Sequence, residues 1–191
     1  ANDMDRLINE LTYYSSIDNN RIPYNFHLIN VAEFFGDCVE EVGLDLGSED
    51  IQLNYSNLVD PDTRIIADPE QLKKVINNII GNSIKYMDKE KGIIDIRLLD
   101  EVDSIRVEIE DNGKGIAAKD LTNIFERFYR TDASRNSMKG GSGIGLSIVK
   151  KIIEDHGGYI WATSREGEGT CLHFVIRKYR EAEENEQDID H

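Results

Sequence analysis

Apolar residues recur at helical spacing in two stretches near the start of this chain. One stretch covers residues 4–14 and the other residues 31–42, and in both the apolar residues stand three or four positions apart. Residues at that spacing share one face of a helix, so each stretch predicts an amphipathic helix. Pro23 interrupts the pattern between them.

Two further helices are predicted in the middle and second half of the chain. Asp68 suits an N-cap, Pro69 the first helical position and Glu70 the first turn, and an apolar face follows in Leu72, Val75, Ile76, Ile79 and Ile80. A later helix is expected over about residues 143–156, with its end at the glycine pair 157–158.

The remaining apolar segments alternate as strands do. Alternation is present in residues 51–55, in 93–99 and 104–110, and in 159–163 and 170–179. The last four runs predict two hairpins, because a short polar stretch joins each pair. A short helix is expected from the shared face of Leu121, Ile124, Phe125 and Phe128. Strands grouped against helices predict an α+β sandwich with helices on one face of the sheet.

The charge balance restricts the ligands that this chain can take. It has 22 basic and 37 acidic residues, a net charge of −15. A nonspecific nucleic-acid surface needs a basic footprint, so we expect no nucleic-acid partner. An anionic ligand must instead be held by locally placed lysines, arginines and backbone N–H groups.

Targeting and cysteine patterns add two expectations. No apolar run approaches the ~20 residues that span a bilayer, and no signal peptide is visible. The chain starts without Met inside a polar helical pattern, so we expect a fragment of a longer protein. Cys38 and Cys171 lack CxxC spacing, which favours reduced thiols in a cytosolic setting and no metal site at these cysteines.

A glycine-rich stretch, MKGGSGIGLSIVKKIIEDHGG, leads into the predicted helix at residues 143–156. Glycines before a helix N-terminus leave backbone N–H groups accessible, and the helix dipole adds partial positive charge there. A phosphate chain would suit the junction of Gly141, Gly143 and Gly145. The spacing is not that of a Walker P-loop or of a dinucleotide fold. A flexible linker is the alternative interpretation.

A second motif, DNGKGI, follows the strand predicted over residues 104–110. It is compatible with a simple turn. The functional interpretation is that Asp111, at a strand end, accepts a hydrogen bond from an exocyclic amine such as that of adenine. Gly113 and Gly115 would let the backbone come close to the base.

Two more stretches carry candidate phosphate and metal ligands. In NNIIGNSIKY, Asn78 and Asn82 are four residues apart and therefore share a helix face. Their amide oxygens suit a Mg²⁺ ion that also binds phosphate oxygens. Lys85, one turn after Asn82, can reach the same phosphate groups. Plain surface asparagines are the alternative. In IFERFYR the aromatic residues suit core packing, and Arg130 can pair with a phosphate.

These four stretches, in this order and spacing, closely resemble the catalytic and ATP-binding domain of sensor histidine kinases. That domain has the Bergerat-type fold, shared with Hsp90, type II topoisomerases and MutL. NNIIGNSIKY resembles the N box of the family, DNGKGI its G1 box, IFERFYR its F box and GGSGIGLSI its G2 box. The resemblance covers about residues 65–174. It implies a two-layer sandwich with a mixed, mostly antiparallel sheet and helices on one face.

The resemblance implies roles for the N-box residues. The position of Asn82 ligates Mg²⁺, and that of Asn78 lies close to the phosphates. The position of Lys85 contacts phosphate, and that of Tyr86 lies beside the nucleotide.

The resemblance also implies an adenine-reading role for Asp111, supported by Gly113 and Gly115. Arg130 matches a residue that contacts the γ-phosphate, and the G2-box glycines match the hinge of a mobile ATP lid. The further ATP-binding positions that it implies are Ile116, Arg127, Arg130, Gly141, Gly143, Ile144, Gly145, Leu146 and Thr170.

One position separates kinases from their ATPase relatives. Those relatives carry a water-activating Glu where this chain has Asn78, and an amide cannot act as a general base. We therefore expect a site that holds Mg-ATP and presents the γ-phosphate to an external histidine. The four histidines of this chain lack the context of the family's H box, so the acceptor is expected outside this fragment, which carries no catalytic residue of its own.

The domain division and the partners follow from the same resemblance. Residues 1–20 resemble the end of a dimerisation hairpin, residues 24–178 the catalytic domain, and residues 180–191 an acidic tail that is expected to be disordered. The implied partners are ATP, the protein's own dimerisation and phosphoacceptor domain, and a response-regulator receiver domain. The parent is expected to be a homodimer anchored in the bacterial membrane, with this part cytoplasmic and, by itself, monomeric.

Two other classes of function remain open at this point. One is a nucleotide-binding regulatory module, either a degenerate kinase or an anti-sigma serine kinase type. The intact boxes argue against the first, and the N-terminal helix argues against the second. The other is a Bergerat-fold ATPase, which Asn78 disfavours.

Overall fold

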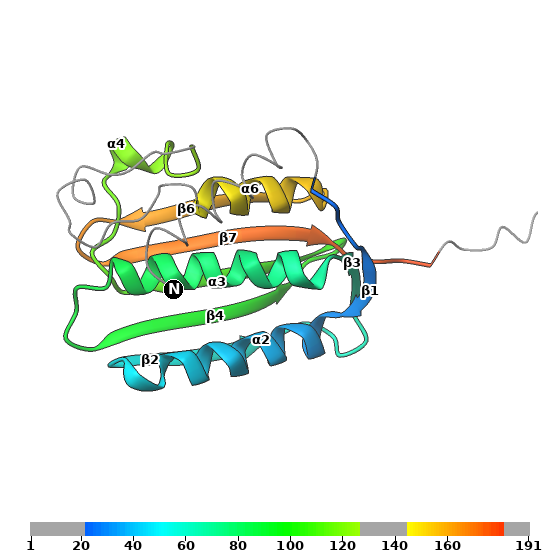
Figure 1. Cartoon of the computed structure of the whole chain (residues 1–191), viewed down its shortest axis with the longest axis horizontal. Helices are drawn as coiled ribbons and strands as arrows, with labels where there is room; N and C mark the ends of the chain where they lie inside the picture. The colour runs from blue at the N-terminus through cyan, green and yellow to red at the C-terminus, as the bar shows by residue number, and fades with distance from the viewer. Residues whose placement is uncertain (1–21, 127–144, 182–191) are drawn as a thin grey trace, which may run out of the picture.

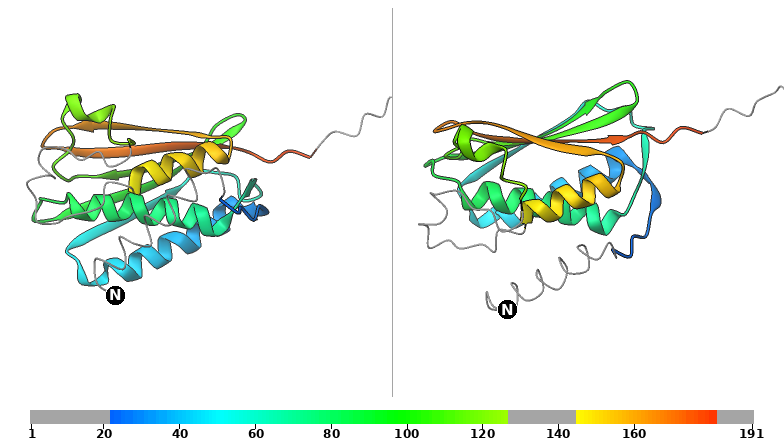
Figure 2. Two further views of the ribbon diagram at one scale, coloured as in Figure 1. Left: turned by 45° about the horizontal axis from the view of Figure 1, so that its top comes forward. Right: turned by 90° about the horizontal axis from the view of Figure 1, so that it is seen from above.

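The computed structural model describes residues 22–126 and 145–181 of the 191-residue chain. These residues form two layers, a five-stranded sheet and a layer of three helices on one of its faces (Figures 1 and 2). The helices are α2 (Val31–Asp45), α3 (Pro69–Lys85) and α6 (Gly145–Asp155). The three helices run side by side, with α3 in the middle (Figure 1).

The sheet has the strand order β2-β4-β5-β7-β6. Strand β2 pairs in parallel with β4, and the other neighbours are antiparallel. The strand bounds are β2 Ile51–Asn57, β4 Gly92–Asp100, β5 Ser104–Asp111, β6 Tyr159–Arg165 and β7 Gly169–Arg177. This arrangement confirms the predicted α+β sandwich with a mixed, mostly antiparallel sheet and helices on one face.

The core lies between the sheet and the helices. In β4 the residues Ile94, Ile96 and Leu98 are buried, while Asp95 and Arg97 between them are only half-buried. Successive side chains of a strand point to opposite faces, so the apolar set faces the helices and the polar set forms the outer face. On the helix side the core is filled by residues such as Phe35, Leu72, Ile79, Ile152 and Ile153.

The predicted start of α3 is confirmed in detail. The side chain of Asp68 accepts hydrogen bonds from the main-chain N–H groups of Glu70 and Gln71, at 3.0 and 3.2 Å. Pro69 takes the first helical position, where the missing N–H costs nothing. The helix ends at Lys85, and Tyr86 forms its C-cap.

Three elements were not expected or differ from expectation. Strand β1 (His27–Asn30) pairs with β3 (Arg64–Ala67) in a separate two-stranded antiparallel sheet. A 3₁₀ turn (Leu46–Ser48) follows α2. The short helix α4 covers Ala118–Leu121, which is earlier in the chain than predicted. After it, the main-chain N–H groups of Asn123 and Glu126 donate to carbonyls three residues back, those of Asp120 and Asn123, so the α-helical hydrogen-bond pattern does not continue.

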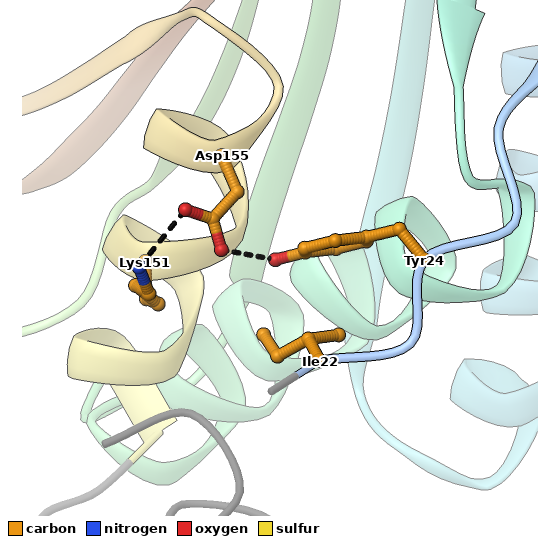
Figure 3. Close-up of a pocket in the computed structure, with 4 residues that line it drawn as sticks. All are labelled: Ile22, Tyr24, Lys151 and Asp155. Carbon is orange, nitrogen blue, oxygen red and sulfur yellow. Dashed lines mark hydrogen bonds and ion pairs between the residues drawn. The ribbon is translucent and has the colours of Figure 1, made fainter. Parts of the chain in front are cut away.

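The segment before β1 lies against the C-terminal part of α6 (Figure 3). The hydroxyl of Tyr24 donates to Asp155 Oδ2 at 2.6 Å, and Lys151 Nζ lies 2.9 Å from the other carboxylate oxygen. The rings of Tyr24 and Phe26 stack on each other and contact His156 edge-on. Ile22, Tyr24, Lys151 and Asp155 line a cavity of about 240 Å³.

Two expectations fall on parts of the chain that the structure does not describe. The helix predicted over residues 4–14 lies outside the described residues, and so do residues 182–191 of the tail predicted over 180–191. Across residues 22–126 and 145–181, no helix has both the length and the apolar character that a membrane crossing requires.

Candidate functional site

Asp111 lies at the end of β5 with only 9% of its surface exposed. Its Oδ1 atom accepts hydrogen bonds from the N–H groups of Gly113 at 2.9 Å and Thr170 at 3.3 Å. The hydroxyl of Ser83 on α3 also hydrogen-bonds to this carboxylate. Burial raises the pKa of Asp111, and the three hydrogen bonds only partly offset that effect. The site therefore presents a fixed, poorly solvated carboxyl group, which favours a partner that donates hydrogen bonds.

The turn after Asp111 depends on two glycines. A Cβ at Gly113 would stand 2.7 Å from the carbonyl oxygen of Tyr86 and 3.0 Å from Asp111 Oδ1. Gly115 has φ of +73°, and a Cβ there would stand 2.4 Å from the carbonyl oxygen of Arg165. The backbone of this turn thus packs directly against both the end of α3 and the β6–β7 hairpin, which is possible only without side chains at these positions.

Other residues hold the same turn in place. The side chain of Asn112 accepts from Ile93 N–H at 2.7 Å and donates to the carbonyl of Lys91 at 3.1 Å, so it serves as a structural link to the start of β4. The N–H of Ile116 donates to Ser164 Oγ at 2.8 Å. The turn is therefore anchored on two sides by side-chain hydrogen bonds.

Two ammonium groups meet near the Tyr86 ring, that of Lys85 from the end of α3 and that of Lys114 from the turn. The carbonyl of Tyr86 accepts from Lys114 N–H at 3.2 Å. The Nζ atoms of Lys85 and Lys114 lie 5.2 and 5.1 Å from the centroid of the Tyr86 ring. In a chain with net charge −15 this pair is a local concentration of positive charge. It can act on an anionic ligand beside Asp111.

Asn78 and Asn82 continue the same side of α3 toward α6. Asn78 donates its side-chain N–H to the carbonyl of Lys74 at 2.9 Å. Its Oδ1 faces Gly145, the first residue of α6, where a Cβ would stand 3.4 Å away. Asn78 and Asn82 are both half-buried, whereas the neighbouring Asn77 is exposed. The expected spacing of the two amides on one helix face is confirmed.

The structure thus brings several predicted site residues together. Asn78 lies against Gly145, Asn82 follows one turn later on α3, Ser83 contacts Asp111, and Thr170 pairs with Asp111 across the sheet. Leu146 follows Gly145 in the first turn of α6 and is half-buried. The predicted residues Arg127, Arg130, Gly141, Gly143 and Ile144 lie outside the described residues.

Sequence reasoning missed three residues of this site. Ser83 occupies the buried face of α3, four positions after Ile79, and a polar residue in that apolar stripe was the available indication. Lys114 stands inside DNGKGI, between the two glycines of the turn. Ser164 lies on β6, and nothing in its local sequence connects it with the turn.

A cluster on the outer face of the sheet lies apart from this site. Glu108, Cys171 and His173 gather there, and of the described residues they are the ones close enough together to resemble a metal site. Arg97 and Arg106 already contact the carboxylate of Glu108 at 3.1 and 2.9 Å. Two guanidinium groups at the carboxylate oppose a bound cation.

The cysteines themselves are neutral thiols. Burial, reinforced by nearby Glu108, raises the pKa of Cys171 to about 12. Burial and the charge of Glu41 raise the pKa of Cys38 to about 11. Because the thiolate is the form that binds metals, the raised pKa values disfavour metal binding by these thiols.

Fold and site define an α+β domain with a buried carboxylate, paired helix amides and lysines around a glycine turn. Residues 67–180 match the family described as "Histidine kinase-, DNA gyrase B-, and HSP90-like ATPase". The chain belongs to this family.

Among curated relatives, the chain is 33% identical over 186 residues to sensor histidine kinase WalK of Bacillus subtilis (strain 168). It is 32% identical over 185 residues to sensor protein kinase WalK of Staphylococcus aureus (strain MRSA252). These alignments cover 97% and 91% of this chain, but only 30% and 28% of the relatives.

Solved histidine kinases share the fold. The catalytic domain of histidine kinase ThkA, in a nucleotide-free form, is similar with a TM-score of 0.68 and 29% identity, covering 80% of this chain and 95% of that one. The structure of ThkA in complex with the response regulator protein TrrA is similar with a TM-score of 0.71 and 27% identity, covering 92% of this chain and 47% of that one.

Proposed function

We propose that this chain is the ATP-binding kinase module of a sensor histidine kinase. The observation that carries the proposal is the buried carboxylate of Asp111, held by Gly113, Thr170 and Ser83 beside helix α3, which carries the two amides and Lys85. A fixed acceptor of this kind suits the exocyclic amine of adenine. The lysines and the N-terminus of α6 suit the phosphates.

Within this proposal, Asn82 holds Mg²⁺. Its amide oxygen is a hard, neutral ligand, and Mg²⁺ commonly keeps several waters and binds through few protein ligands together with substrate phosphates. When bound, the ion neutralises charge on the phosphate chain. Lys85 and Lys114, whose Nζ atoms lie 5.2 and 5.1 Å from the centroid of the Tyr86 ring, would add positive charge there.

The module holds ATP without activating water for its hydrolysis. Asn78 has an amide where a general base would be needed, and that amide is bonded to its own helix through Lys74. The γ-phosphate would then be presented to a histidine on the protein's dimerisation and phosphoacceptor domain. A response-regulator receiver domain would accept the phosphoryl group from that histidine. The parent would be a membrane-anchored homodimer with this module in the cytoplasm.

Calorimetric titration tests the nucleotide site. Wild-type chain is expected to bind a non-hydrolysable ATP analogue in the presence of Mg²⁺ and to bind the corresponding GTP analogue more weakly. Asp111→Asn should lose at least about tenfold in affinity for the ATP analogue, since hydrogen bonds to charged groups contribute ~1.5–3 kcal/mol. Glu110→Gln, the adjacent carboxylate on the outer face of β5, is the control and should bind normally. Absence of ATP binding by the folded wild-type chain would refute the proposal.

The phosphate side of the site can be tested separately. Lys85→Met and Lys114→Met are expected to weaken binding of the ATP analogue while leaving adenosine binding unchanged. Lys73→Met is the matched control, because Lys73 lies on the same helix but pairs with Glu41 at 2.6 Å on an exposed face. Equal losses for ATP and adenosine would mean that the two lysines do not act on phosphate.

A further inference from the structure

Ser164 on β6 uses its hydroxyl group in three contacts at once. Its Oγ donates to the carbonyl of Gly169 at 2.8 Å and accepts from the N–H of Ile116 at 2.8 Å. The third contact is with Thr170 Oγ1, at 2.9 Å. Gly169 and Thr170 lie on β7, and Ile116 belongs to the turn after Asp111.

These contacts determine the direction of the hydrogen bond between the two hydroxyl groups. A serine hydroxyl has one proton and two lone pairs. The proton of Ser164 is used on Gly169, and one lone pair is used on Ile116. The remaining lone pair can only accept, so Thr170 must donate its proton to Ser164.

The consequence is that Thr170 Oγ1 has only lone pairs left for any other partner. Thr170 stands directly opposite Asp111 in the β5–β7 register and donates its own N–H to Asp111 Oδ1. Both residues are buried, with 7% and 9% of their surface exposed. The carboxylate and the threonine hydroxyl therefore form two adjacent hydrogen-bond acceptors.

We propose that Ser164 is a positioning residue for base selectivity, because it fixes the hydroxyl of Thr170 as an acceptor beside Asp111. The inference rests on the proposed nucleotide site. Two fixed acceptors favour a purine edge that carries an amine, directly or through a bridging water. A purine with an oxygen at that place meets two acceptors and is rejected.

Loss of the Ser164 hydroxyl should relax this selectivity. Without it, the hydroxyl of Thr170 can rotate and donate its proton outward. An outward donor suits the oxygen of hypoxanthine, the base that differs from adenine at this edge. ATP affinity should fall and ITP affinity should rise or stay level, so their ratio is a readout that general destabilisation would not change.

The experiment is calorimetric titration of the whole chain with non-hydrolysable analogues of ATP and ITP in the presence of Mg²⁺. The ratio of the two affinities is compared among wild type, Ser164→Ala, Thr170→Val and the double variant. Thr163→Ala is the control, since Thr163 is the neighbouring residue on β6 and contacts His173 on the outer face. Ser164→Thr keeps a hydroxyl and is expected to keep the wild-type ratio.

The expected result is a five- to tenfold lower ATP-to-ITP ratio in Ser164→Ala, an order of magnitude typical for one hydrogen bond. Adding Ser164→Ala to Thr170→Val should change the ratio no further, because both changes act through the same hydroxyl. If Ser164→Ala does not fold, the wild-type ratio in Ser164→Thr and its loss in Thr170→Val support the inference.

Two outcomes overturn it. An unchanged ratio in Ser164→Ala or in Thr170→Val, with ATP still bound, refutes the role of Ser164 and leaves the proposed nucleotide site standing. Absence of ATP binding by the folded wild-type chain refutes both together.

Discussion

His156 accepts a hydrogen bond at Nε2 from the main-chain N–H of Asp68, at 3.1 Å. This bond joins the C-terminal end of α6 to the N-cap of α3. The other ring nitrogen, Nδ1, lies 2.7 Å from the carbonyl oxygen of Ile152, so the ring is the neutral tautomer that donates there. His156 therefore links the ends of two helices that carry the candidate site.

The first prediction is that acid weakens the fold through His156. Burial lowers the pKa of His156 below its ordinary value of 6.5, although Ile152, Asp68 and Asp155 oppose this. In that range the unfolded chain binds the proton more readily, so the stability contributed by neutral His156 is present above pH 6.5 and is lost as the pH falls toward the lower folded-state pKa.

His156→Gln should be less stable by ~1–2 kcal/mol at pH 7.5, because a flexible glutamine cannot bridge the Asp68 N–H and the Ile152 carbonyl as the ring does. Its melting temperature should then fall less than that of the wild type between pH 7.5 and 5.5. His27→Gln, at an exposed position on β1, is the control. Parallel pH profiles for wild type and His156→Gln would contradict the prediction.

The second prediction separates stability from binding at Asp111. Burial raises the pKa of Asp111, so its ionised form makes the folded state less stable. The stability that the protonated form contributes is therefore lost as the pH rises through this raised pKa. At pH 7, the melting temperature of Asp111→Asn should therefore equal that of the ligand-free wild type or exceed it by up to about 4 °C. Affinity for the ATP analogue should fall at least about tenfold in the same variant. A large drop in melting temperature would show that the carboxylate is needed for the fold itself.

The third prediction concerns the close approach of the turn to α3. Gly113→Ala places a methyl group 2.7 Å from the Tyr86 carbonyl, so denaturant unfolding should report a loss of more than ~2 kcal/mol. Gly36→Ala in the interior of α2 is a matched comparison, since nothing lies within 4 Å of a Cβ there. That variant should gain up to ~1 kcal/mol. Equal effects at the two positions would mean that the turn can shift without cost.

The fourth prediction tests the contact of the segment before β1 with α6. Tyr24→Phe removes the hydrogen bond to Asp155 and should cost ~0.5–1.5 kcal/mol. Hydrogen exchange should become faster in residues 22–26 and at the end of α6. In a double-mutant cycle with Asp155→Asn the two losses should be less than additive. Full additivity would show that the bond seen in Figure 3 contributes nothing.

The fifth prediction concerns Asn78. Asn78→Glu places a carboxylate on the half-buried side of α3 that faces Gly145, and we expect it to gain slow ATP hydrolysis, measured as phosphate release. Asn77→Glu changes the exposed neighbour by the same atoms and should gain none. Hydrolysis by wild type, or equal gains in both variants, would contradict the assignment of Asn78.

Local patterns were sufficient where neighbouring residues alone decide the structure. Asp68 and Pro69 predict the start of α3 because the cap is made within the first turn. The spacing of Asn78 and Asn82 predicts a shared face because helix geometry is fixed. By contrast, β1 could not be recognised, since its partner β3 lies far along the chain.

The sequence by itself determined the helices α2, α3 and α6, the two hairpins and the family, because each depends on residue types at short, fixed spacing. Only the tertiary structure decided which groups meet. It placed the hydroxyl of Ser83 on the carboxylate of Asp111 and that of Ser164 between Thr170 and the glycine turn. It also placed His156 on the cap of α3. These contacts join residues far apart in the chain, and their formation depends on how the strands and helices pack.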